Sequence, residues 1–267
     1  MGAARMDTAL NWTSDDEFAI DGISFICRGA KVGLKSTAHR FCIIKPRWQI
    51  ERYDQLILET APKNIVELGI WDGGSTAYFA QRAHPNKLVA LDLTPEPCEA
   101  LESFIETRGL RDAIATYYGV DQADIQKLTE ILDREYHGDP LDLVVDDASH
   151  LVEETRRSFN FLFPHLSPGA PYVIEDWSSA HSALVPPLAT PLSVFVVEVM
   201  LACGHRPRLI EEIVIKKGWA LVRRGPEAID PASFDVSTYT GKVGRGLMRN
   251  LSRPWSDGEP DPSGAIA

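Results

Sequence analysis

The sequence lacks any long hydrophobic run. None of its apolar stretches reaches the roughly 18–20 residues that a membrane-spanning helix requires, and its first 18 residues contain no segment like the hydrophobic core of a secretory signal peptide. The four cysteines are scattered, and none is in the CxxC spacing of a metal or redox site. These absences predict a cytoplasmic protein with reduced thiols and no membrane span.

Positive charge is also scarce. Against 38 Asp and Glu residues stand 27 Lys and Arg residues, which gives a formal net charge of −11. Because nucleic-acid binding depends on clustered Lys and Arg, this balance argues against a nucleic-acid partner. The length of 267 residues and the hydrophobic content of 44% fit one large α/β domain with additions.

Two segments flank the central part of the chain. Residues 1–62 are expected to form an N-terminal extension, with a β-hairpin over residues 18–28 around Asp21-Gly22 and a helix between Pro46 and Pro62. Between the two, residues 29–46 are irregular and basic, and they suit a flap over a polar ligand or a solvated loop about equally; their basic residues are Lys31, Lys35, His39, Arg40 and Lys45. Residues 226–267 are rich in Pro, Gly, Asp and Ser and are predicted to be an extended or partly disordered tail.

Residues 63–225 alternate between strand-like and helix-like segments. Strands are expected near residues 65–68, 87–91, 113–118, 141–146 and 171–175, with helices between them, which predicts a Rossmann-like, doubly wound, mostly parallel sheet. A helix over Thr190–Cys203 follows, capped by Thr190 and closed by Gly204. It is apolar nearly all round, so it is buried under the sheet or in a subunit contact such as a dimer. Residues 208–224 then read as an antiparallel hairpin around Lys217-Gly218.

A glycine-rich loop follows the first of these strands. Glu67 ends the strand, and glycines at 69, 73 and 74 allow a tight turn and a close approach of backbone to ligand. The N-terminus of the next helix offers unpaired N–H groups, with Ser75 or Thr76 available as a cap. The spacing is not the GxGxxG of dinucleotide-binding folds. A carboxylate before the loop suits a cationic head group and would repel a pyrophosphate, which fits S-adenosylmethionine. The alternative is a turn that serves only the fold.

The next two strands also end in polar residues. Asp92 stands where an acidic side chain commonly binds ribose hydroxyls, or it caps the following helix. Asp121 and Gln122 follow the third strand, level with the expected adenine, although Asp121 also suits an N-cap.

Acidic clusters end the fourth and fifth strands. The first contains Asp146, Asp147 and His150, and the second contains Glu175 and Asp176. Because the carboxyl ends of parallel strands face one crevice, we expect a hard-metal site with a general base beside it. Carboxylates favour Mg²⁺ or Mn²⁺ over Zn²⁺. Two ligands from consecutive residues require that the fifth strand has ended there. Strand-end carboxylates near a helix start, with a surface histidine, are the alternative.

The motifs VELGIWDGGST, LVALD, LVVDDASH and YVIEDW resemble those of class I S-adenosylmethionine-dependent methyltransferases over residues 63–225. They are most similar to the Mg-dependent sugar O-methyltransferases that act on macrolide sugars, rhamnosyl groups and mycobacterial methylated polysaccharides. The resemblance implies that His150 is the base and that three carboxylates bind the metal: Asp147, Glu175 and Asp176. Asp146 is then left on the cofactor side. Ala148 departs from a frequent glycine, a change that matters only if this backbone needs positive φ.

The expected function is therefore S-adenosylmethionine- and Mg-dependent methylation of a sugar hydroxyl on a small molecule or oligosaccharide. Two alternatives stay open: a metal-dependent methyltransferase of a catechol-like acceptor, and a related hydroxylase-type or non-transferring protein that keeps the cofactor site. Glu67, the glycine spacing and the terminal hairpin disfavour a nicotinamide dehydrogenase. Trp177 and His181 are candidates to line the acceptor site.

Overall fold

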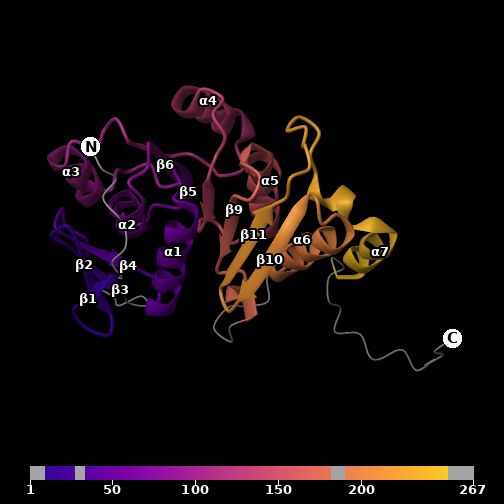
Figure 1. Cartoon of the computed structure of the whole chain (residues 1–267), viewed down its shortest axis with the longest axis horizontal. Helices are drawn as coiled ribbons and strands as arrows, with labels where there is room; N and C mark the ends of the chain where they lie inside the picture. The colour runs from indigo at the N-terminus through magenta and orange to yellow at the C-terminus, as the bar shows by residue number, and fades with distance from the viewer. Residues whose placement is uncertain (1–9, 28–33, 182–189, 252–267) are drawn as a thin grey trace.

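A computed structural model describes residues 10–27, 34–181 and 190–251 (Figure 1). The strands are β1 (Asn11–Trp12), β2 (Glu17–Ile20), β3 (Ile23–Cys27), β4 (Arg40–Ile43), β5 (Asn64–Leu68), β6 (Lys87–Asp92), β7 (Ile114–Tyr118), β8 (Leu143–Asp146), β9 (Pro171–Glu175), β10 (Ile210–Lys216) and β11 (Trp219–Arg224). The helices are α1 (Arg47–Thr60), α2 (Gly74–Ala83), α3 (Glu99–Thr107), α4 (Ile125–Tyr136), α5 (Val152–Leu162), α6 (Ser193–His205) and α7 (Gly241–Leu251). Short 3-10 turns are η1 (Phe163–His165), η2 (Ser179–His181) and η3 (Val236–Tyr239).

The central sheet has seven strands in the order β10-β11-β9-β8-β5-β6-β7. β5 to β9 are parallel, and β11 joins β9 antiparallel as part of the β10–β11 hairpin. The predicted doubly wound sheet with a terminal hairpin is therefore confirmed. The register pairs Leu68 of β5 with Asp146 of β8, so the glycine loop begins beside the first acidic cluster.

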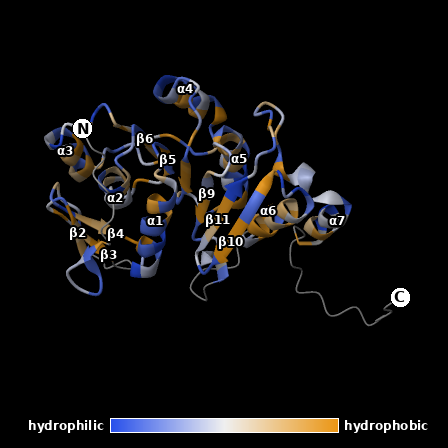
Figure 2. Cartoon of the chain, viewed as in Figure 1, coloured by the Kyte–Doolittle hydropathy of each residue, from blue (hydrophilic) through white to orange (hydrophobic). Residues whose placement is uncertain are grey.

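The two faces of this sheet are covered by different parts of the chain. Successive residues of a strand point to opposite faces: Val66 packs in the core with α4, α5 and α6, whereas Ile65 packs with α1, α2, α3 and the small sheet. Figure 2 shows the central strands as mainly hydrophobic, as expected for parallel strands buried on both sides. The apolar character of α6 is explained by this packing within the chain, where Phe195 and Val199 are fully buried.

The N-terminal extension forms a second, four-stranded sheet in the order β1-β2-β3-β4. The predicted hairpin is present, with Asp21 and Gly22 both at positive φ, as a two-residue type I′ turn requires. The prediction of an irregular segment up to residue 46 was wrong for Arg40–Ile43, which pair with β3 as the parallel strand β4. Burial of Phe41 and Ile43 explains this strand. Lys31 and the start of the predicted flap lie outside the described residues.

Two predicted boundaries need correction. α6 begins at Ser193 rather than at a Thr190 cap, and Gly204 lies inside it without positive φ; Arg206 is the C-cap. The tail is not extended over residues 236–251, which form η3 and α7. Buried Val236 and Met248 anchor these turns. Within the described ranges, no helix is both long and apolar enough to cross a membrane.

The first residue of α2 should be intolerant of a side chain. A Cβ on Gly74 would lie 2.1 Å from the carbonyl oxygen of Cys42 in β4, whereas one on Gly204 would meet nothing within 4 Å. We expect Gly74→Ala to lower the free energy of unfolding by about 1–3 kcal/mol through overpacking. Gly204→Ala should be neutral or stabilising by up to about 1 kcal/mol. Urea denaturation of both variants checks this, and equal stabilities would show that β4 does not press on α2.

Candidate active site

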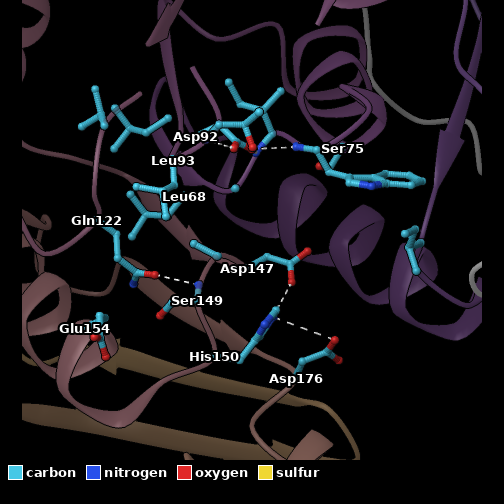
Figure 3. Close-up of a pocket in the computed structure, with 18 of the residues that line it drawn as sticks. Leu68, Ser75, Asp92, Leu93, Gln122, Asp147, Ser149, His150, Glu154 and Asp176 are labelled. Atoms are coloured by element: carbon cyan, nitrogen blue, oxygen red, sulfur yellow. Dashed lines mark hydrogen bonds and ion pairs between the residues drawn. The ribbon is translucent and has the colours of Figure 1, made fainter. Parts of the chain in front are cut away.

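A cavity of about 500 Å³ lies at the carboxyl ends of the parallel strands (Figure 3). The connection between β4 and α1 closes its other side through Cys42, Ile43, Ile44 and Lys45. Most of the residues predicted for the site line this cavity: Gly69, Gly74, Ser75, Asp92, Asp121, Gln122, Asp147, His150 and Asp176. Glu67, Gly73, Asp146 and Glu175 do not line it.

The glycines of the loop are required by close packing within the chain. A Cβ on Gly69 would lie 2.1 Å from the carbonyl oxygen of Asp147, and Gly69 also has positive φ. Gly73 has positive φ and a Cβ there would meet Leu101 at 2.8 Å. These glycines therefore make room for neighbouring parts of the chain rather than, as had been expected, for a ligand. They let the loop press against β4, α3 and the end of β8.

Asp92 holds the glycine loop in place. Its Oδ2 accepts hydrogen bonds from the backbone N–H groups of Ile70 and Trp71, both at 2.9 Å, and its Oδ1 accepts one from Thr94 at 2.8 Å (Figure 3). Burial alone would raise the pKa of Asp92, but these backbone donors outweigh it and the pKa is lowered. Asp92 is thus an ionised group on the cavity wall.

Glu67 lies fully buried behind the loop. Its Oε2 accepts a hydrogen bond from the Thr76 hydroxyl at 2.6 Å, and its Oε1 has no donor among the described residues. Burial raises the pKa of Glu67 to about 7, although the nearby hydroxyl groups of Ser75 and Thr76 oppose the rise. An orphaned buried carboxylate oxygen fits a site for a cationic ligand group, because a positive charge would favour the ionised form.

Asp146 and Gln122 form a buried network under the loop that carries His150. The Asp146 carboxylate accepts hydrogen bonds from Tyr172, Ser158 and Gln122 at 2.8, 3.0 and 3.1 Å. Gln122 Oε1 in turn accepts the backbone N–H of Ser149 at 2.8 Å (Figure 3). Burial raises the pKa of Asp146 to about 6. The pair therefore supports the backbone next to His150.

The other residue expected near the adenine position does not cap a helix. Asp121 lines the cavity and accepts the N–H of Ala123 at 2.8 Å. The N-cap of α4 is Asp124, whose side chain accepts from Lys127. The helix starts after this aspartate because Asp124, rather than Asp121, satisfies its first free N–H groups.

Three side chains converge at the end of the cavity. His150 Nε2 lies 3.1 Å from Asp147 Oδ1 and 3.9 Å from Asp176 Oδ2 (Figure 3). Single ligand atoms of the three residues all lie within 4.8 Å of one another. Burial lowers the pKa of His150, but the hydrogen bond and charge of Asp147 outweigh it, so the pKa is raised.

Both His150 and Asp176 have left-handed backbone conformations, with φ of 57° and 49°. Such strain in non-glycine residues clusters at functional sites and persists where the surroundings fix it. Gln122 supports the loop before His150, and the Asp176 N–H donates to the carbonyl of Gly218 in the β10–β11 turn at 2.8 Å. Ala148, at a position where the resembling sequences frequently have glycine, does not have positive φ. The substitution is therefore accommodated.

Glu175 is separated from this cluster. β9 ends at Glu175, as two consecutive ligands would require, but the side chains diverge. The Glu175 carboxylate is buried and accepts hydrogen bonds from Tyr53 at 2.5 Å, from Lys45 at 2.8 Å and from Gln49. Lys45 also donates to Asp147 Oδ2 at 2.6 Å. The expected convergence of three carboxylates is thus divided into two halves that share Asp147.

Lys45 was missed as a site residue and treated as part of a basic flap. The available signal was spacing, since Lys45, Gln49 and Tyr53 recur every four residues and therefore share one helical face. Trp177 donates to the Lys216 carbonyl at 2.8 Å, and His181 lies 2.8 Å from the Ser193 hydroxyl. Neither lines the cavity.

Residues 66–177 match a family profile described as a methyltransferase domain. The match covers β5 to β9, the two acidic clusters and the glycine loop. This part of the chain is similar to methyltransferase domains. Its sheet, a parallel core with a terminal antiparallel hairpin, is that of the class I fold.

Curated relatives extend the similarity beyond this domain. The demethylmacrocin O-methyltransferase of Streptomyces fradiae is 32% identical over 167 residues, which cover 58% of this chain and 39% of that protein. The mycinamicin VI 2''-O-methyltransferase of Micromonospora griseorubida is 29% identical over 167 residues, 58% of this chain and 38% of that protein. The chain spans less than half the length of these two relatives.

A solved structure shares the fold. The MycE methyltransferase from the mycinamycin biosynthetic pathway, in complex with Mg, S-adenosylhomocysteine and mycinamycin VI, superposes with a TM-score of 0.52. The two are 24% identical, and the alignment covers 69% of this chain and 50% of that one.

The buried Glu67 predicts a measurable pH effect. Because its pKa is about 7 in the folded protein and 4.5 as an ordinary glutamate, the folded state binds the proton more tightly. Its stabilising contribution is therefore present at acid pH and is lost as the pH rises from about 4.5 to 7. Between pH 5 and 8, we expect the ligand-free protein to lose up to about 3 kcal/mol of stability relative to Glu67→Gln.

Denaturation of both proteins at the two pH values measures this difference. Glutamine keeps an oxygen for the Thr76 hydroxyl, so the comparison isolates the charge. Parallel pH dependence of the two proteins would show that Glu67 titrates normally.

Proposed function

We propose that the protein is an S-adenosylmethionine- and Mg²⁺-dependent O-methyltransferase that methylates a sugar hydroxyl. The observation that carries this proposal is the position of Asp147, His150 and Asp176 in the same cavity as the glycine loop and Asp92 (Figure 3). A general base and cation ligands thereby share one space with a nucleotide-type site, which a transfer between two bound molecules needs. The similarity to O-methyltransferases of glycosylated natural products supports the sugar acceptor.

The cofactor assignment uses the loop and the strand ends around it. The N–H groups at the start of α2, with Ser75, would face the cofactor's polar groups. Asp92 Oδ1 accepts only one hydrogen bond from the described residues and so has a further lone pair for a ribose hydroxyl, because each carboxylate oxygen can accept two. The free Oε1 of Glu67 would offset the amino group's charge. Asp121 and Gln122 would flank the base, and Asp146 acts behind Gln122.

The donor set fits a hard divalent cation. Asp147 Oδ1 and Asp176 provide oxygen ligands, and the group of possible ligands that converges among the described residues, Asp147, His150 and Asp176, contains no cysteine. When all three are ionised, Asp147, Asp176 and Glu175 carry three negative charges and Lys45 one positive charge, so the remaining charge matches one Mg²⁺ or Mn²⁺. Glu175 would be a direct ligand only if Lys45 left its Oε2.

The chain's own residues account for the proton and the geometry. When bound, S-adenosylmethionine would supply a sulfonium methyl group, and the divalent cation would supply a Lewis acid that favours ionisation of the acceptor hydroxyl. His150 accepts the hydroxyl proton on its imidazole ring, which lies beside Asp147 with Nε2 3.1 Å from Oδ1. Asp147 and Asp176 stabilise the resulting imidazolium by their charge. The acceptor oxygen forms the C–O bond as the C–S bond breaks, so the electron pair goes to sulfur.

Removal of the imidazole should stop transfer without unfolding the site. His150 and His137 have nearly the same left-handed φ, 57° and 55°, and asparagine tolerates this conformation. We expect His150→Asn to lower kcat by about 10²–10⁴-fold, with binding of S-adenosylhomocysteine retained. His137→Asn, at an exposed helix end far from the cavity lining, is the matched control. If His150→Asn turns over at the wild-type rate with Mg²⁺ saturating, His150 is not the base.

Metal removal provides a second test. After dialysis against EDTA, we expect methyl incorporation into a glycoside panel to be lost and to return on addition of Mg²⁺ or Mn²⁺. Full activity in EDTA would contradict the proposed role of the carboxylates. A parallel panel of catechols tests the acceptor class, and exclusive methylation of catechols would replace the sugar assignment.

A further inference from the structure

The stripe formed by Lys45, Gln49 and Tyr53 lies outside the matched methyltransferase domain but reaches into its site. Lys45 precedes α1, and Gln49 and Tyr53 follow on the same face of the helix. All three donate to one acceptor, the buried Glu175 at the end of β9. Only Lys45 also lines the cavity.

Three donors surround the buried carboxyl group of Glu175. They are the Tyr53 hydroxyl, the Gln49 amide and the Lys45 ammonium, which all donate hydrogen bonds to its oxygens. A buried carboxylate with this many donors is fixed in orientation. It therefore fixes the ammonium of Lys45, which is only 3% exposed.

Lys45 in turn fixes the orientation of the Asp147 carboxylate. Its Nζ lies 2.8 Å from Glu175 Oε2 and 2.6 Å from Asp147 Oδ2, so it bridges the two carboxylates. With Oδ2 held, the second oxygen of Asp147 faces His150 Nε2 at 3.1 Å. The result is a continuous chain of contacts from Glu175 through Lys45 and Asp147 to His150.

We propose that Lys45 is a positioning residue of the transfer reaction, which aims Asp147 at His150 and at the cation site and keeps Glu175 out of the direct ligand set. This inference rests on the proposed function. Lys45 acts through Asp147, to which its Nζ donates a hydrogen bond. Its loss should therefore reduce kcat while cofactor affinity stays nearly constant.

The test compares four variants by steady-state kinetics and by calorimetric titration with S-adenosylhomocysteine and with Mn²⁺. For Lys45→Met we expect kcat to fall at least about tenfold, the affinity for S-adenosylhomocysteine to stay within about twofold, and Mn²⁺ to bind no more tightly than to wild type. Lys45→Arg should recover part of kcat, because a guanidinium can also bridge two carboxylates. Lys87→Met is the control, since Lys87 pairs with Glu135 at 3.0 Å away from the cavity lining.

The fourth variant guards against a loss of folding. Lys45→Met leaves the buried carboxylate of Glu175 facing the half-buried carboxylate of Asp147 without a cation between them, whereas the double variant Lys45→Met/Glu175→Gln restores the charge balance. Because both changes break the contact between Lys45 and Glu175, we expect the double variant to show the same kcat and Mn²⁺ affinity as Lys45→Met.

Three results would overturn the inference while leaving the proposed function intact. The first is wild-type kcat in Lys45→Met. The second is tighter Mn²⁺ binding in that variant, which would mean that the ammonium merely fills a cation position. The third is a further loss of Mn²⁺ binding in the double variant, which would make Glu175 a direct ligand. Absence of metal-dependent transfer in wild type would instead contradict the proposed function itself.

Discussion

The site depends on one buried ammonium ion between two carboxylates. Lys45 joins Glu175 at the end of β9 to Asp147 after β8, and it comes from the connection between the small sheet and α1. Charges removed from water are costly unless they are paired and hydrogen-bonded, and removal of one partner from such a pair typically costs about 3–5 kcal/mol. The docking of the N-terminal segment on the central sheet is thereby coupled to the geometry of the acidic cluster.

The same constraint explains how the strand ends are held. Gly69 lies so close to the Asp147 carbonyl that no side chain fits between them, while Asp92 ties down the rest of the loop. On the opposite side, the β10–β11 turn holds Asp176 through the Gly218 carbonyl. The glycine loop and the acidic cluster are thus in direct contact through backbone atoms, and the strained conformations of His150 and Asp176 persist because their neighbours are fixed.

Much of this fold could be predicted from the sequence, because βα alternation and strand-end acids are local patterns. The parallel sheet, the terminal hairpin and the Asp147–His150 pairing were accessible in this way. β4 was not, since its strand character comes from pairing with β3 and burial of Phe41. The role of Lys45 in the site could not be predicted, because its partners are 102 and 130 residues away along the chain. The helical part of the tail likewise depends on long-range burial of Val236.

The two halves of the cluster differ in how far neighbouring groups neutralise their charge. In the inner half, Glu175 is buried and has three donors, one of which is the Lys45 ammonium. In the outer half, Asp176 is 59% exposed at its side chain and has only His150 beside it among the ionisable partners that the described residues supply. Of the three carboxylates, that of Asp176 therefore has the least neutralised charge, and its oxygen lies within 4.8 Å of ligand atoms of Asp147 and His150. In the proposed function, this is where the divalent ion would bind.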